Sequence, residues 1–292
     1  MEYNCTLCPR NCGAIRTENS NNGGFCKLPL KLYVCRAMLH FWEEPPISGK
    51  NGSGAVFFAG CPLRCCFCQN AEISRLPSGR AINPERLSEI FKRLESSGAH
   101  NINLVSPTPY VPLIIKALQM YQPKIPVIYN TGGYETENTI EMLKDYVDVF
   151  LFDFKFWDPA RAARYAMAEN YPSAVKKAIL KSAEFVKEPQ YNSEGNLTKG
   201  IIIRHLLLPS GTKDACNIID WVKNNCETAL FSLMNQYTVM PNVEFIELLR
   251  KVTPREYNKV LQHMIDTGLD GFVQEAESAS QEYIPDFDQS GV

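Results

Sequence analysis

The pattern of apolar and polar positions changes near residue 55 and then stays regular along most of the chain. From there, short apolar runs alternate with amphipathic segments, which is typical of strands that alternate with helices. The apolar runs predict strands at residues 55–59, 102–105, 126–129, 148–152, 201–208 and 230–234, with a short one at 271–274. The amphipathic segments predict helices at residues 83–98, 112–121, 136–146 and 213–224, and a last helix after Thr253-Pro254.

The first of these helices carries clear signals at both ends. Asn83 is a good N-cap residue, and Pro84 fits the first turn, where its missing N–H costs nothing. Apolar residues then recur three and four positions apart, and Gly98 can end the helix. We therefore expect this helix to form close to the limits that its sequence marks.

Repeated strand–helix units predict parallel strands joined by right-handed crossovers. Six units favour an α/β fold built as a partial (β/α)6 barrel, because a full eightfold barrel takes about 250 residues by itself. We expect a Cys-rich metal-binding extension at residues 1–50, a barrel core at 51–240, and a C-terminal helical extension at 241–292 packed on the core. Residues 286–292 are expected to be frayed.

Composition excludes classes of function more than it identifies one. The chain has 292 residues, 45% of them hydrophobic, and a net charge of −2, which gives no reason to expect nucleic acid or an anionic membrane as a partner. No apolar stretch approaches the roughly 20 residues of a membrane span, and the first residues lack a signal-peptide pattern. We therefore expect a cytoplasmic protein. In that reducing compartment, eleven unevenly spaced cysteines indicate metal rather than disulfides.

Three cysteines lie close together in residues 60–70, which read GCPLRCCFCQN. Cys61, Cys65 and Cys68 can converge only if the backbone loops around one centre. That loop follows the first expected strand, on the carboxyl side of the sheet, where the active sites of parallel α/β folds gather. Thiolates suit iron–sulfur clusters and zinc. Zinc needs four ligands, and Cys66 is a poor fourth because adjacent side chains point apart, so we expect Cys66 to be packed instead.

The spacing C-x3-C-x2-C, with Phe67 just before the last cysteine, resembles the radical S-adenosylmethionine (SAM) superfamily. The resemblance implies that Cys61, Cys65 and Cys68 bind three irons of a [4Fe–4S] cluster, and that SAM binds the fourth iron through its amino and carboxylate groups. It further implies reductive cleavage of SAM to a 5′-deoxyadenosyl radical that abstracts hydrogen. An electron donor such as flavodoxin or ferredoxin would be needed.

Further segments resemble the uncharacterised homologues of pyruvate formate-lyase activating enzyme. This likeness runs from about residue 5 to residue 237 and is carried by residues 5–12, 40–49, 101–105, 129–135 and 204–205. It implies an oxidoreductase whose substrate is a protein with a glycyl radical site. A radical SAM enzyme acting on a small molecule or peptide, and a non-catalytic iron–sulfur or zinc interaction module, are the alternatives.

The chain departs from the activating enzymes after the second expected strand. Those enzymes usually carry Gly-Gly-Glu there, and its carboxylate helps to hold the SAM amino group. This chain has Ser106-Pro-Thr108-Pro instead, with no carboxylate. We expect the hydroxyls of Ser106 and Thr108 to take part in SAM binding in its place.

Polar residues at three other strand ends complete the expected cofactor site. Asn130 and Thr131 follow the third strand and can hydrogen-bond SAM, although the Gly-Gly pair after them is also an ordinary turn. Asp153 and Lys155 share one face of the next strand end, where they can meet SAM or substrate or form a salt bridge with each other. Arg204 lies in a very apolar strand and needs a charged partner, which the resemblance suggests is the SAM carboxylate.

Two weaker expectations concern neighbouring positions. His205 points to the opposite face from Arg204 and is expected to be structural. Asn235 and Gln236 follow the sixth strand and are expected near the substrate opening.

Four cysteines near the start form a second candidate site. Cys5, Cys8, Cys12 and Cys26 supply enough thiolates for a zinc ion or an auxiliary iron–sulfur cluster, and Cys35 is a substitute ligand. Without metal, such a poorly periodic segment would lack a stabilising core. The spacing does not choose between zinc and iron.

Overall fold

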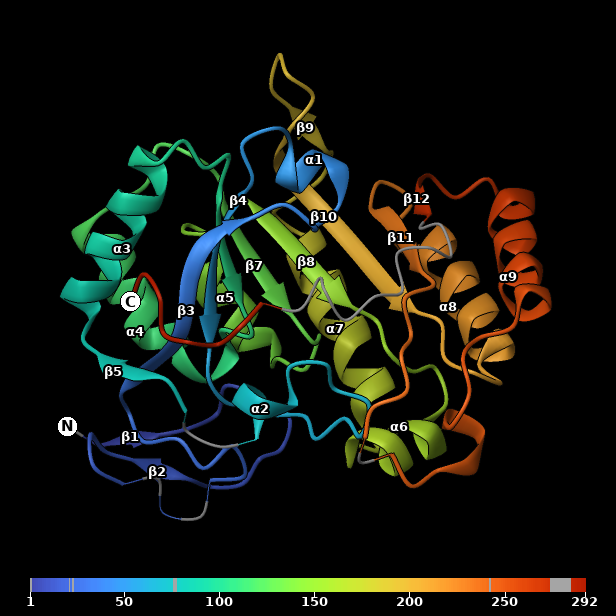
Figure 1. The fold of residues 1–292 in the computed structure, drawn as a ribbon, viewed down its shortest axis with the longest axis horizontal. Coiled ribbons are helices and arrows are strands. Elements are labelled where there is room, and N and C mark those ends of the chain that lie inside the picture. The colour runs from blue at the N-terminus through green and yellow to red at the C-terminus, as the bar shows by residue number, and fades with distance from the viewer. Residues whose placement is uncertain (1, 21, 23, 76–77, 242, 274–284) are drawn as a thin grey trace.

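The computed structural model describes residues 2–20, 22, 24–75, 78–241, 243–273 and 285–292. A single large sheet carries the fold (Figure 1), with the strand order β12-β11-β10-β8-β7-β6-β4-β3-β5 and β9 paired to β10. The parallel strands are β4 (Ser53–Phe58), β6 (Ile102–Val105), β7 (Val127–Thr131), β8 (Val149–Asp153), β10 (Leu197–Leu206), β11 (Leu230–Met234) and β12 (Gly271–Val273). The antiparallel strands of this sheet are β3 (Leu32–His40), β5 (Arg80–Ile82) and β9 (Gln190–Tyr191), and β1 (Tyr3–Asn4) and β2 (Ile15–Arg16) form a separate hairpin.

Helices form at each place where the sequence pattern predicts one, and two further helices form between β8 and β10, where the sequence analysis predicts none. The longer ones are α3 (Pro84–Ser96), α4 (Val111–Met120), α5 (Glu137–Leu143), α6 (Pro159–Ala166), α7 (Tyr171–Ala183), α8 (Thr212–Asn225) and α9 (Pro254–Thr267). Single turns are α1 (Pro45–Ser48), α2 (Ala71–Ser74), η1 (Thr108–Tyr110) and η2 (Ile246–Leu248). In the described part of the chain, none of these helices has the length and apolarity that crossing a bilayer requires.

The predicted α/β partial barrel is confirmed, since the expected strands pair in parallel and the sheet stays open between β12 and β5. The cap of α3 forms as predicted: the Asn83 side chain accepts a hydrogen bond of 2.9 Å from the Arg86 backbone N–H. Strands buried on both faces read as continuous apolar runs, which is why these segments were recognisable in the sequence.

The inner face of the sheet is divided into layers by the twofold alternation of strand side chains. Ile128, Leu151, Ile202 and Leu230 form an apolar layer, and Ile47 of α1 packs against them. Two residues further along the same strands come polar side chains, Asn130, Asp153, Arg204 and Ser232. An apolar floor therefore lies directly beneath a polar layer.

The sheet begins earlier than the expected boundary at residue 50. Strand β3 pairs antiparallel with β4 from Val34 to His40, so it belongs to the barrel sheet and not to the extension. Its irregular alternation, with Arg36 in mid-strand, concealed it. The first residues instead form the β1–β2 hairpin with its loops (Figure 1).

The expectation of a frayed tail is wrong for the residues described. The tail runs along β3 (Figure 1), where the Ala37 N–H donates to the Ser290 carbonyl at 3.1 Å and the Gln289 N–H donates to the Cys35 carbonyl at 2.9 Å. Strand β5 covers only Leu32 to Val34 of the same edge. The tail thus satisfies backbone groups that an edge strand would otherwise expose, an arrangement that limits strand-to-strand aggregation.

Candidate active site

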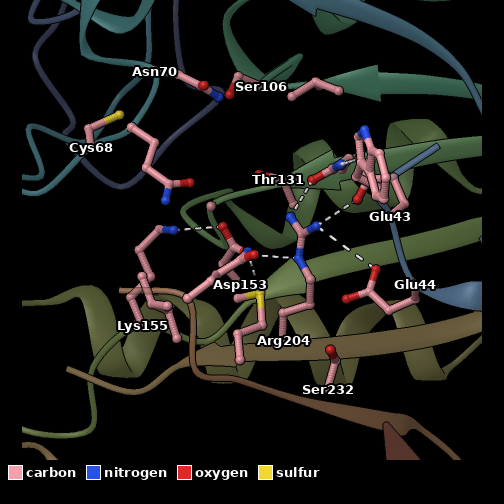
Figure 2. A pocket seen from close by; sticks show the side chains of 18 of the residues that line it. Glu43, Glu44, Cys68, Asn70, Ser106, Thr131, Asp153, Lys155, Arg204 and Ser232 are labelled. Atoms are coloured by element: carbon pink, nitrogen blue, oxygen red, sulfur yellow. Dashed lines mark hydrogen bonds and ion pairs between the residues drawn. The ribbon is translucent and has the colours of Figure 1, made fainter. Parts of the chain in front are cut away.

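A cavity of about 810 Å³ opens at the carboxyl ends of the parallel strands (Figure 2). Its wall combines thiols from the loop after β4, polar side chains from the strand ends, and the segment between β3 and α1. Large concave sites with convergent polar groups are the usual location of ligands in α/β folds. The expected site residues Ser106, Asn130, Thr131, Asp153, Lys155 and Arg204 all line it.

The three clustered thiols face this cavity together. Cys61, Cys65 and Cys68 line it, whereas Cys66 does not. The end of α6 holds this loop in place. The Cys66 N–H donates to the Tyr165 carbonyl at 2.8 Å, and the Arg64 N–H donates to the Ala166 carbonyl at 3.3 Å. The backbone therefore turns Cys66 away from the cavity that its neighbours share.

Burial keeps Cys61 and Cys65 protonated unless a cation replaces the proton. Burial raises the pKa of Cys61 to about 12 and also raises the pKa of Cys65, which the Lys155 ammonium partly offsets. The nearby Cys68 thiol raises the pKa of both, so the three are close enough to interact. A bound metal centre deprotonates such thiols and gains affinity from the deprotonated ligands.

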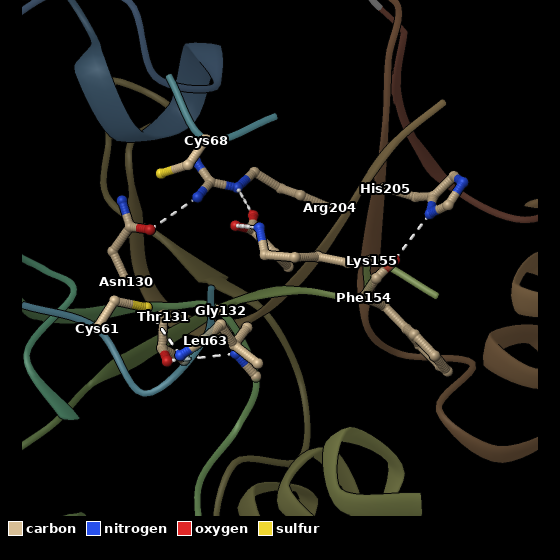
Figure 3. A network of polar contacts seen from close by, with 12 residues as sticks. Cys61, Leu63, Cys68, Asn130, Thr131, Gly132, Phe154, Lys155, Arg204 and His205 are labelled. Atoms are coloured by element: carbon tan, nitrogen blue, oxygen red, sulfur yellow. Dashed lines mark hydrogen bonds and ion pairs between the residues drawn. The ribbon is translucent and has the colours of Figure 1, made fainter. Parts of the chain in front are cut away.

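Arg204 lies at the centre of the polar layer, and each of its three guanidinium nitrogens donates a hydrogen bond. Its Nε donates to Asp153 Oδ1 at 2.8 Å, its Nη1 to Glu43 Oε2 at 2.9 Å, and its Nη2 to Asn130 Oδ1 at 2.7 Å (Figures 2 and 3). Burial opposes the charge, but the carboxylates of Asp153, Glu44 and Glu43 hold the pKa of Arg204 above its ordinary value. The charged partner that the sequence demanded is thus supplied by the protein itself.

Glu43 and Glu44 belong to the site, and the sequence reasoning missed them as functional residues. They precede α1, whose Ile47 packs on the apolar floor, and their carboxylates reach the Arg204 guanidinium. The available signal is the acidic pair before Pro-Pro in residues 40–49, one of the segments that carry the family resemblance. No local rule predicts that this segment enters the barrel.

Thr108, expected as a SAM contact, lies outside the cavity. Its side chain is 3% exposed because η1 turns it back toward β7, where its hydroxyl donates to Glu135 Oε1 at 2.6 Å. The Thr131 hydroxyl donates to the same oxygen. Burial raises the pKa of Glu135 to about 7. Thr108 therefore supports a buried carboxyl group rather than a ligand.

His205, Asn235 and Gln236 are the remaining strand-end residues for which the sequence gives an expectation. The His205 ring faces away from the cavity, and its Nδ1 lies 2.7 Å from the Phe154 carbonyl oxygen (Figure 3). Burial lowers the pKa of His205 to about 4, as expected of a structural, neutral histidine. Gln236 lines the cavity, whereas Asn235 does not.

The model of the radical SAM superfamily matches residues 55–200, which include the whole thiol loop and the polar strand ends up to β8. This chain belongs to the radical SAM superfamily. The superfamily's cofactors are a [4Fe–4S] cluster and SAM, and its members are enzymes that take electrons from a donor.

Individual relatives agree with that membership. The chain is 30% identical over 271 residues to the uncharacterized protein MJ0674 of Methanocaldococcus jannaschii. This alignment covers 89% of this chain and 73% of that protein. It is 23% identical over 240 residues to the pyruvate formate-lyase-activating enzyme of Clostridium pasteurianum, covering 75% and 94%. The crystal structure of Streptococcus suis SuiB bound to SAM shares the fold, with a TM-score of 0.54 and 17% identity over 76% of this chain. The chain spans about half the length of SuiB.

The thiol loop of this radical SAM protein suits a cubane better than a single ion. Among the residues that the structure describes, no three Cys, His, Asp or Glu side chains are grouped so as to hold one metal ion. In a cubane each thiolate binds its own iron, so the sulfurs need not meet at one point. Three thiols around one wall of a cavity, one buried and two half-buried, with the Lys155 cation nearby, fit a cluster that carries negative charge.

The N-terminal thiols lie near Cys8 and beside a buried arginine. Burial raises the pKa of Cys8 to about 12, and Cys5, Cys26 and Cys12 raise it further. Arg16 is fully buried beside them and donates to the carbonyls of Leu28, Pro29 and Pro109. Cys35 is not part of this group; it packs on the inner face of β3 with Ala55 and Phe57.

The N-terminal lobe is clamped to the thiol loop. Arg10 Nε donates to the Pro62 carbonyl at 2.8 Å, and its guanidinium carbon lies 3.8 Å from the centre of the Phe25 ring. Arg64, in the loop itself, donates to the Phe25 carbonyl at 3.0 Å. The two thiol groups therefore share a rigid boundary that the sequence did not reveal.

Proposed function

We propose that this protein reductively cleaves SAM at a [4Fe–4S] cluster bound by Cys61, Cys65 and Cys68, and abstracts a hydrogen atom from a substrate in the adjoining cavity. The observation that carries the proposal is that these three thiols, and not Cys66, line one wall of a polar cavity at the strand ends. Superfamily membership supports the chemistry. We further propose a flavodoxin or ferredoxin as the electron donor.

Some of the cavity residues would contact SAM directly, and others would act by holding those residues in place. The Ser106 hydroxyl and the Lys155 ammonium line the cavity on the cluster side and are the best candidates for the SAM amino and carboxylate groups. Lys155 is held at 2.6 Å by Asp153, which keeps two of its three N–H donors available. Thr131 lines the cavity as well, but its hydroxyl already donates to Glu135. Arg204 and Asn130 act indirectly, because they already hold each other and Glu43.

The substrate we favour is a protein that carries a glycyl radical site. The support is the likeness to a pyruvate formate-lyase-activating enzyme over three quarters of this chain. A peptide or small molecule is the second candidate, favoured by two observations: the chain lacks the Gly-Gly-Glu carboxylate, and the cavity ends in a charged layer. SuiB, which shares the fold, has been crystallised with its precursor peptide SuiA.

The test is cofactor retention and SAM cleavage by matched cysteine variants. Anaerobically reconstituted protein is reduced with dithionite, and 5′-deoxyadenosine is quantified together with bound iron. Alanine variants of Cys61, Cys65 or Cys68 are expected to lose SAM cleavage and the iron of one cluster, whereas Cys66→Ala, one position along the loop from Cys65, retains both. A triad variant that keeps its cluster, or a wild-type protein that binds iron but never cleaves SAM, would refute the proposal. An electron paramagnetic resonance signal of a glycyl radical on an added partner distinguishes the two substrates.

We also propose that Cys5, Cys8, Cys12 and Cys26 hold a second metal, zinc or an auxiliary cluster, and a zinc ion would require these thiols to draw closer together than they lie in the described structure. Their mutual effect on the pKa of Cys8 supports this proposal. Cys8→Ala is expected to lower the metal content by one site, whereas Cys216→Ala, a thiol of α8 outside both groups, leaves it unchanged. Equal zinc and iron in the two variants would contradict the second site.

A further inference from the structure

The inner end of the cavity holds more negative than positive groups. Three carboxylates, of Glu43, Glu44 and Asp153, surround the Arg204 guanidinium at 2.9, 4.0 and 2.8 Å. Lys155 supplies the second positive charge, 2.6 Å from Asp153. Three acids thus share two bases, and one carboxylate lies farther from a cation than the other two.

That carboxylate is Glu44. Glu43 is fully engaged, since its Oε1 accepts from the side-chain amides of Asn103 at 3.0 Å and Asn130 at 3.2 Å, and its Oε2 accepts from Arg204. Glu44 is only 7% exposed, and its Oε2 has no hydrogen-bond donor among the described residues. Figure 2 shows the Glu44 side chain directed at the Arg204 side of the cavity. Burial raises the pKa of Glu44, which Arg204 and a contact with Ser232 only partly offset. A buried carboxylate oxygen without a donor is costly, and a cationic ligand removes that cost.

The position of Glu44 points to substrate rather than to SAM. Lys155 is close enough to Cys65 to affect its pKa, and Asp153, Arg204 and then the two glutamates follow in one chain of contacts. The thiols therefore lie at one end of this chain and Glu44 lies at the other. SAM chelates the cluster through its amino and carboxylate groups in this superfamily, so those groups belong at the thiol end.

The surroundings of the glutamates suit a side chain with an aliphatic stem and a charged tip. Phe41 and Trp42, 49% and 62% exposed, come directly before them and line the cavity, and Phe272 of β12 lines it as well. Aromatic faces attract cations and pack against methylene groups. Beneath the carboxylates lies the apolar floor built around Ile47, which offers no competing cation.

We propose that Glu44, positioned beside Glu43, binds an ammonium or guanidinium group of the substrate, which is a lysine or arginine side chain where the substrate is a protein or peptide. The inference rests on the proposed function for the identity of the cavity as the substrate site. The inference predicts a positively charged ligand group. Lysine and arginine probes then distinguish an ammonium from a guanidinium.

The experiment measures a preference for charge in the full-length reconstituted protein with SAM present. Three probes are titrated: the N-acetyl methylamides of lysine, of arginine and of norleucine, the last matching the lysine stem without its charge. At least one cationic probe is expected to bind about tenfold more tightly than norleucine, the ratio that corresponds to about 1.4 kcal/mol. The Glu44→Gln variant, which keeps the side-chain shape, is expected to reduce that ratio below about threefold.

Control variants keep the outcome interpretable. Glu188→Gln, an exposed carboxylate outside the cavity, is expected to retain the full preference. Glu44→Asp, which keeps the charge, is expected to retain part of it and covers the case in which the amide variant folds poorly. Equal binding of norleucine and the cationic probes overturns the inference, as does a preference that survives in Glu44→Gln.

Two readouts separate this inference from the proposed function. SAM binding is titrated in parallel, and a loss of SAM affinity in Glu44→Gln as large as the loss of probe affinity would assign the glutamate to SAM and overturn the inference. Formation of 5′-deoxyadenosine by the wild-type protein tests the proposed function alone. Cleavage of SAM without any preference for cationic probes refutes only the substrate charge.

Discussion

Replacing Glu135 with glutamine should change how stability depends on pH. Glu135 is 1% exposed, and its Oε1 accepts hydrogen bonds from the Thr108 and Thr131 hydroxyls. Burial raises its pKa from 4.5 to about 7. A glutamine oxygen can accept the same two hydrogen bonds, so the substitution removes the titration and keeps the shape.

The sign follows from proton linkage. A carboxyl group whose pKa is higher in the folded than in the unfolded protein stabilises the fold most when it is protonated, below pH 4.5. That contribution is lost as the pH rises from 4.5 through 7, and little changes at higher pH. At about 1.4 kcal/mol per pH unit, the displacement from 4.5 to about 7 corresponds to about 3 kcal/mol.

Denaturant unfolding of the metal-free, fully reduced protein at pH 5, 6, 7 and 8 measures this effect. The free energy of unfolding of the wild type, minus that of Glu135→Gln, is expected to fall by up to about 3 kcal/mol between pH 5 and 8, with most of the change before pH 7. The same difference for Glu188→Gln, an exposed carboxylate, is expected to stay nearly constant. A constant difference for Glu135→Gln, or one that rises with pH, would refute the assignment of a buried, protonated carboxyl group.

Three other substitutions test contacts described above. Arg10→Ala removes the clamp on the thiol loop, so iron should be released to a chelator several-fold faster than from the wild type. Arg204→Lys cannot reproduce the three-sided contacts, and thermal unfolding should show a loss of about 3 kcal/mol because carboxylates stay buried and unpaired. Gly291→Ala would place a Cβ 2.2 Å from the Ala37 carbonyl oxygen, so hydrogen exchange at the Ala37 amide should accelerate; Gly195→Ala, also at positive φ but with open space, should leave that exchange unchanged.

The elements that the sequence predicted well are those whose cause is local. The cap and first turn of α3 depend on adjacent residues, and the parallel strands show as uninterrupted apolar runs because both of their faces are buried. The thiol loop is equally local, since one short segment supplies all three cysteines that face the cavity. The antiparallel β3 escaped prediction because its pattern is irregular, and β4 selects its register.

By itself, then, the sequence determined the strand–helix alternation, the thiol spacing and the presence of a buried arginine that needed a partner. Only the tertiary structure decided that the partners of Arg204 are Glu43 and Asp153, because these residues lie 161 and 51 positions away along the chain. The same holds for Thr108, which turns to Glu135, and for the tail, which covers the edge of β3. Ion pairing and edge protection act between surfaces that meet only after the sheet has formed, so no window of sequence contains both partners.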